Sequence, residues 1–181
     1  MEYQSHFILM ADYNLRMNEQ FYEAAGKLSE EEVSADKGAF FGSILGTLNH
    51  MLVGDLIWLS RFSTHSTRYQ SLRALKDLPQ PEGLDHVLYP NLELLTPVRK
   101  RVDASIRNWL LNEVEASDFT KTLTYQNVKG VTSERNFGEL VSHFFNHQTH
   151  HRGQASTLLN QLGVDVGVTD FLIDIPDVRV G

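Results

Sequence analysis

The sequence predicts an all-α fold, a four-helix bundle with a short β-hairpin between the third and fourth helices. Four long stretches repeat apolar residues at intervals of three and four, the spacing of an amphipathic helix. Only one stretch, between the third and fourth of these, changes to the pattern of extended chain. The length of 181 residues suits one domain over 1–181 with a core of its own.

The first expected helix covers residues 5–28 and the second covers 43–63. The apolar stripe of the second helix is wide, which is typical of a helix with neighbours on more than one side. Between the two helices, residues 36–41 are expected to form a packed connector, because Phe40 and Phe41 need burial.

The third expected helix covers residues 91–113 and the fourth covers 137–162. Asn136 is the expected N-cap of the fourth helix, because a glutamate follows it at the capping-box spacing. The hairpin is expected between 119 and 135, where β-branched and aromatic residues flank a Lys-Gly turn at 129–130.

Composition excludes several classes of protein. The formal net charge is −7 and the basic residues are scattered, which argues against a nucleic-acid surface. No apolar run approaches the ~20 residues that cross a membrane, and the first residues do not resemble a secretory signal, so we expect a cytoplasmic protein. There is no cysteine, so a metal must be held by nitrogen or oxygen ligands.

Histidine is concentrated in the fourth expected helix. Four of the eight histidines of the chain lie between His143 and His151. Residues four apart share one face of a helix, so His147 and His151 can bind the same ion, as can His143 and His147. His150 is one residue off this face. A third ligand should come from another helix, and His50 is the natural candidate because an unpaired imidazole among apolar neighbours is costly.

Three histidine ligands leave at least one position on the ion for water or substrate, which is typical of a reactive site. Imidazole suits several divalent metals, with zinc or nickel as first candidates, then iron or manganese. A zinc-protease site is excluded because Gln148 occupies the position of the general-base glutamate. A di-iron bundle is excluded because its pair of Glu-x-x-His motifs is absent.

Three segments resemble the DinB/YfiT-like family of metal-dependent proteins, also called damage-inducible DinB-like. They are NHQTHHRGQ at 146–154, LNHML at 48–52 and GAFFGSI at 38–44. The resemblance extends over nearly the whole chain and implies a four-helix bundle, often a homodimer. It also implies one metal ligand from the second helix and a His-x-x-x-His pair from the fourth, which are His50, His147 and His151 here.

The resemblance further implies a metal-dependent thiol S-transferase, which would take a low-molecular-weight thiol and a small electrophile. The alternative is a non-catalytic metal-binding stress-response protein. Asn14 and Arg152 are candidate substrate-binding residues. Two simpler roles remain open: Asn14 and Asn18 would hydrogen-bond between helices, and Arg152 would pair with a surface acid.

Overall fold

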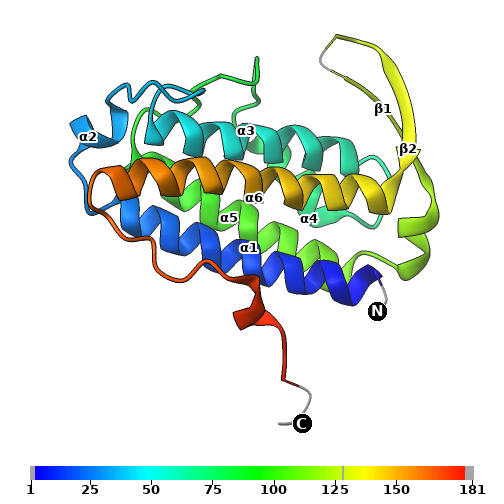
Figure 1. Cartoon of the computed structure of the whole chain (residues 1–181). Helices are drawn as coiled ribbons and strands as arrows, with labels where there is room; N and C mark the ends of the chain where they lie inside the picture. Colours follow the sequence, from blue (N-terminus) through cyan, green and yellow to red (C-terminus); the bar gives the residue numbers. More distant parts are fainter. Residues whose placement is uncertain (1–2, 128, 178–181) are drawn as a thin grey trace.

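A computed structural model describes residues 3–127 and 129–177 of the chain. It confirms an all-α fold with one small hairpin, in which four long helices run side by side (Figure 1). These helices are α1 (Tyr3–Ala25), α3 (Ile44–Phe62), α5 (Leu92–Asn112) and α6 (Phe137–Gln161).

Shorter elements connect the long helices. The two short α-helices are α2 (Glu30–Ser34) and α4 (Gln70–Arg73), and the 3₁₀ turns are η1 (Ala74–Asp77), η2 (Ala116–Thr120) and η3 (Phe171–Asp174). Strands β1 (Thr122–Gln126) and β2 (Thr132–Asn136) pair antiparallel and project from one end of the bundle (Figure 1). The hairpin therefore lies where the sequence predicts it, directly before α6.

Polar side chains fix where three of the long helices begin. Ser43, Asn91 and Asn136 each accept a hydrogen bond from a backbone N–H in the first turn of α3, α5 and α6. The expected N-cap of the last helix is thus confirmed. The sequence analysis missed α2, which begins with a full capping box between Ser29 and Glu32.

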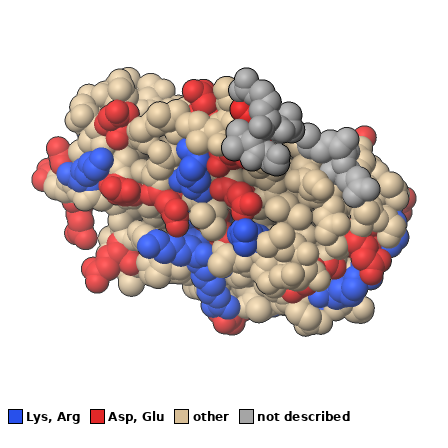
Figure 2. Space-filling view, turned by 90° about the horizontal axis from the view of Figure 1, so that it is seen from below, with Lys and Arg blue, Asp and Glu red and all other residues tan. Residues whose placement is uncertain are grey.

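The helices pack so that α6 contacts both α1 and α3, and α5 lies against α1. Aromatic residues fill the end of the core nearest the hairpin, where Trp109 and Phe137 are fully buried. None of the helices in the described ranges is long and apolar enough to cross a membrane. Viewed from the side of α1, acidic and basic side chains interleave over the surface (Figure 2).

The connector before α3 differs from the expectation. Phe40 is 86% exposed, so the prediction that it would be buried is wrong. Phe41 is partly buried, and its ring stacks on the imidazole of His50. A tight turn, closed by a bond from the Gly42 N–H to the Ala39 carbonyl, turns the two neighbouring rings to different surroundings.

A charged network lies inside the bundle. The Arg99 guanidinium is 2.6 Å from Asp55 on α3 and 2.8 Å from Asp103 on its own helix. All three side chains are buried. A buried charge is tolerated only when it is paired, so this network ties α5 to α3 through the core.

Candidate metal centre

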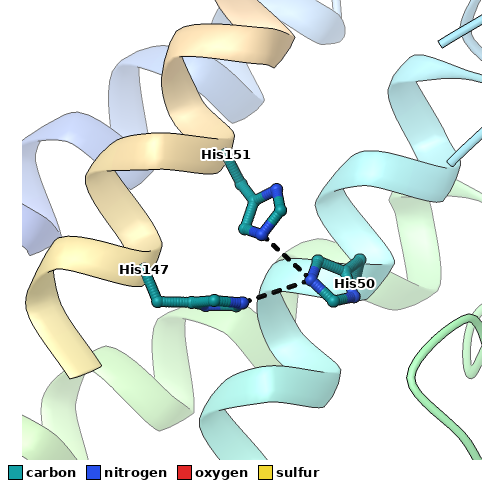
Figure 3. Close-up of side chains that lie close together, drawn as sticks. All are labelled: His50, His147 and His151. Carbon is teal, nitrogen blue, oxygen red and sulfur yellow. Dashed lines mark hydrogen bonds between the residues drawn. The ribbon is translucent and has the colours of Figure 1, made fainter. Parts of the chain in front are cut away.

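The structure brings together the three histidines that the sequence singles out. His50 comes from α3, and His147 and His151 come from adjacent turns of α6 (Figure 3). The Nε2 atom of His50 lies 3.2 Å from Nε2 of His147 and 3.1 Å from Nε2 of His151. In the described part of the chain, these are the residues whose ligand atoms gather closely enough to hold a metal ion.

The second nitrogen of two of these rings faces a hydrogen-bond acceptor. Nδ1 of His50 lies 2.6 Å from the Leu84 carbonyl oxygen, and Nδ1 of His151 lies 2.7 Å from Oε1 of Gln154. Each Nδ1 therefore carries the proton in the neutral ring, which leaves a lone pair on each Nε2. Two lone pairs 3.1 Å apart repel each other unless a cation lies between them. The donor set thus fits a metal ion, and the acceptors behind it orient the ligands.

The spacing also fits the size of a first-row divalent ion. With metal–nitrogen bonds of about 2.0–2.1 Å, nitrogens 3.1–3.2 Å apart subtend about 100° at the ion. That angle lies between the octahedral and tetrahedral values. The geometry therefore suits either coordination, and three protein ligands leave room for at least one more group.

Burial keeps the three imidazoles neutral, which is the form that binds metal. Desolvation lowers the pKa of His50 and of His151. The pKa of His147 falls to about 3, first because of burial and then because of the neighbouring histidines.

Gly54 and Phe41, which the sequence did not assign to the site, both shape it. Gly54 lies one turn after His50, and a Cβ at this position would lie 2.6 Å from Cε1 of His147. The Phe41 ring stacks on His50 at a centroid distance of 3.7 Å and meets His151 edge-on. Gly54 could have been predicted to shape the site, because it is a glycine in the middle of a helix, four residues after a candidate ligand.

A polar residue on the inner face of α6 joins this helix to α3. Gln148, between the two ligands of α6, is fully buried. Its Nε2 donates to the Met51 carbonyl at 3.1 Å and also to the Asp55 carboxylate. Each bond joins α6 to a residue of α3 that neighbours His50 or Gly54.

Asn14 and Arg152 lie inside the bundle. The Arg152 guanidinium donates to the Asn14 side-chain oxygen and lies over the Tyr13 ring. Asn14 and Asn18 donate in turn to Asp103. The structure thus shows the helix–helix hydrogen bonding that was the simpler expectation for the asparagines, and Arg152 forms no ion pair with a surface acid of the described chain. Their role in substrate binding stays a prediction.

His143 and His150 lie outside the cluster and are exposed. The His143 ring lies 6.3 Å from the ring of His147 and contacts Trp58 edge-on at 5.2 Å. His143, Trp58 and Tyr125 line a cavity of about 310 Å³ between the hairpin, α3 and α6. The cavity begins one helical turn from a candidate ligand.

Comparison with known proteins agrees with the sequence analysis. The model of the DinB family matches residues 1–176. One similar curated protein is Protein DinB of Bacillus subtilis (strain 168), which is 25% identical over 162 residues that cover 88% of each chain. No solved structure gives a significant match.

Proposed function

The chain belongs to the DinB family, and from this premise we propose that it is a divalent-metal-dependent enzyme of the thiol S-transferase type. The observation that carries the proposal is the convergence of three neutral imidazole nitrogens on one point. His50, His147 and His151 would hold a divalent ion, which would supply Lewis acidity and so lower the pKa of a bound thiol or water.

The residues around the histidines have separable roles. Leu84 and Gln154 orient two of the rings through their Nδ1 atoms. The Phe41 ring covers His50 and keeps water from one face of that imidazole. Gln148 holds the spacing of α3 and α6 through its two donated bonds, and its amide is not basic enough to act as a general base.

The cavity beside His143 supports catalysis over simple storage of an ion. Its volume of about 310 Å³ lies within the range of small-molecule sites, ~300–1,000 Å³. Trp58 and Tyr125 give it aromatic walls. We propose that it holds the electrophile, so that the sulfur displaces a leaving group, which departs with its bonding electrons as the thiol loses its proton.

Elemental analysis of untagged protein, purified without chelator, tests the metal site. We expect about one equivalent of metal in the parent and a loss of metal in His147→Ala. His150→Ala is the matched control, because His150 is an exposed histidine on the same helix and should keep the metal. A parent that binds no zinc, nickel, iron or manganese would refute the site.

Catalysis needs a separate assay. Metal-loaded parent should consume a low-molecular-weight thiol together with a small electrophile, and His147→Ala should not. Failure of the loaded protein to turn over any pair in a broad panel would leave the second candidate, a non-catalytic metal-binding stress-response protein. The observation that favours this alternative is the Phe41 ring over two ligands, which restricts access to the ion.

We also propose that the chain forms a homodimer in the cytoplasm. The exposed Phe40 side chain is one apolar group that a second copy could cover. Light scattering at several protein concentrations would measure the mass, and a monomer throughout would refute the dimer.

A further inference from the structure

A second cavity lies between α1 and α5, two helices that carry none of the three clustered histidines. Its volume is about 400 Å³, large enough for a small organic molecule. Charged side chains of both signs line it. Nothing in the proposed metal chemistry uses this cavity.

Two residues that line the cavity each carry a buried polar atom without a hydrogen bond. Tyr22 is only 7% exposed, and its hydroxyl has no partner in the described structure. The Arg99 Nη2 atom, 2.8 Å from Asp103, is paired by charge but makes no aligned hydrogen bond. Buried donors are almost always satisfied, so the Tyr22 hydroxyl calls for a missing partner. Burial raises the pKa of Tyr22, so its hydroxyl stays protonated and able to donate.

The rim of the cavity separates opposite charges. Glu19 and Glu23 lie one turn apart on α1, and Lys100 lies on α5 across the opening. In the described chain none of the three forms an ion pair, although each lines the same cavity. Opposite charges that face a shared space without pairing leave both signs available to a ligand.

We propose that this cavity binds a small zwitterion of the α-amino acid class. The ligand carboxylate accepts hydrogen bonds from the Tyr22 hydroxyl and from Arg99, and its ammonium group faces Glu19 and Glu23. A simple anion would meet the repulsion of these glutamates with no ammonium group to offset it. A simple cation would leave the buried Tyr22 hydroxyl without an acceptor, which is costly.

Thermal unfolding and titration calorimetry with the common α-amino acids test the proposal. For each amino acid that binds, the matching amine without a carboxylate and the matching acid without an amino group serve as probes. We expect the amino acid to raise the unfolding midpoint and both truncated probes to bind at least about ten-fold more weakly. No shift with any amino acid at millimolar concentration, or equal binding of either truncated probe, would overturn the proposal.

Two matched variants locate the site. Tyr22→Phe removes a hydroxyl that has no protein partner, so it should not lower the unfolding midpoint of the free protein but should weaken binding about ten-fold. Tyr13 is equally buried on the same helix, but its hydroxyl donates to the Thr169 carbonyl. Tyr13→Phe should therefore lower the midpoint and leave affinity unchanged. Parent-like affinity in Tyr22→Phe, or an equal loss in Tyr13→Phe, would overturn the assignment.

The site is independent of the metal centre, so His147→Ala should bind the same amino acids with the affinity of the parent. Loss of amino-acid binding in His147→Ala would place the ligand at the histidines instead and would overturn the proposal.

Discussion

Replacement of Gly54 by alanine should weaken metal binding strongly without unfolding the protein. The new Cβ would lie 2.6 Å from Cε1 of His147, whereas carbon atoms in contact are normally ~3.5–4.0 Å apart. The imidazole must therefore move by about 1 Å. Metal–ligand distances tolerate only ~0.2 Å of error, so a displacement of this size removes one of three ligands.

The substitution should change metal affinity far more than it changes the free energy of unfolding. Loss of ligand orientation should weaken metal affinity on the order of 100-fold. Stability of the metal-free protein should change little, because the clashing group is a side chain that can swing aside. Alanine also favours the helix over glycine by ~0.8–1.0 kcal/mol.

Competition with a chelator would measure the affinity, and urea unfolding of the metal-free protein would measure the stability. Gly153→Ala is the matched control, because Gly153 is a glycine of α6 where an added Cβ would meet nothing within 4 Å. This control should gain stability and keep parent affinity. Gly54→Ala with parent affinity and an intact fold would show that the space beside His147 is not what positions this ligand.

Three further predictions concern the core, the ligands and the cover of the site. Asp55→Ala should lower the free energy of unfolding in urea by ~3–5 kcal/mol, because Arg99 loses a buried partner. Asp77→Ala, which removes an exposed ion pair, should lower it by under ~1 kcal/mol. Equal effects of the two substitutions would contradict this. Because the pKa of His147 is lowered in the folded protein, the unfolded chain binds more protons, and the metal-free protein should lose stability as pH falls from ~6.5 toward about 3. His147→Gln should flatten this part of the profile of urea midpoint against pH. An unchanged profile would show that His147 does not cause the loss of stability. Phe41→Ala should release metal to a chelator faster in stopped-flow mixing, and an unchanged rate would show that the ring does not limit access.

The helices and the histidine cluster could be predicted because their signals are local. The capping side chains of α3 and α6 lie at the edges of the expected ranges 43–63 and 137–162. A spacing of four on one helix fixes the His147–His151 pair, and the family resemblance agrees with His50 as the partner. The first helix begins at Tyr3, two residues before the expected 5–28. It ends at Ala25, three residues early, because Gly26 weakens the last turn.

Other features depend on pairings between distant segments and leave no local pattern. The Leu84 carbonyl behind His50 belongs to an irregular segment 34 residues away. From the sequence, Arg152 is expected to be a surface cation, because it follows two histidines. In the structure it is buried and donates to Asn14 of α1, 138 residues earlier in the chain. The two adjacent phenylalanines of the connector are alike in sequence, and only the turn of the backbone decides which one reaches His50.

The bonds of Gln148 have a consequence for how the protein would acquire a metal ion. Because they join α6 to α3 on the side facing the core, the two helices keep their spacing whether or not an ion is present. The loss of conformational entropy needed to gather the ligands then occurs during folding rather than during metal binding. Such a preorganised site would exchange a bound ion without refolding, so the metal it holds would depend on which ions the cell supplies rather than on which ion is present while the chain folds.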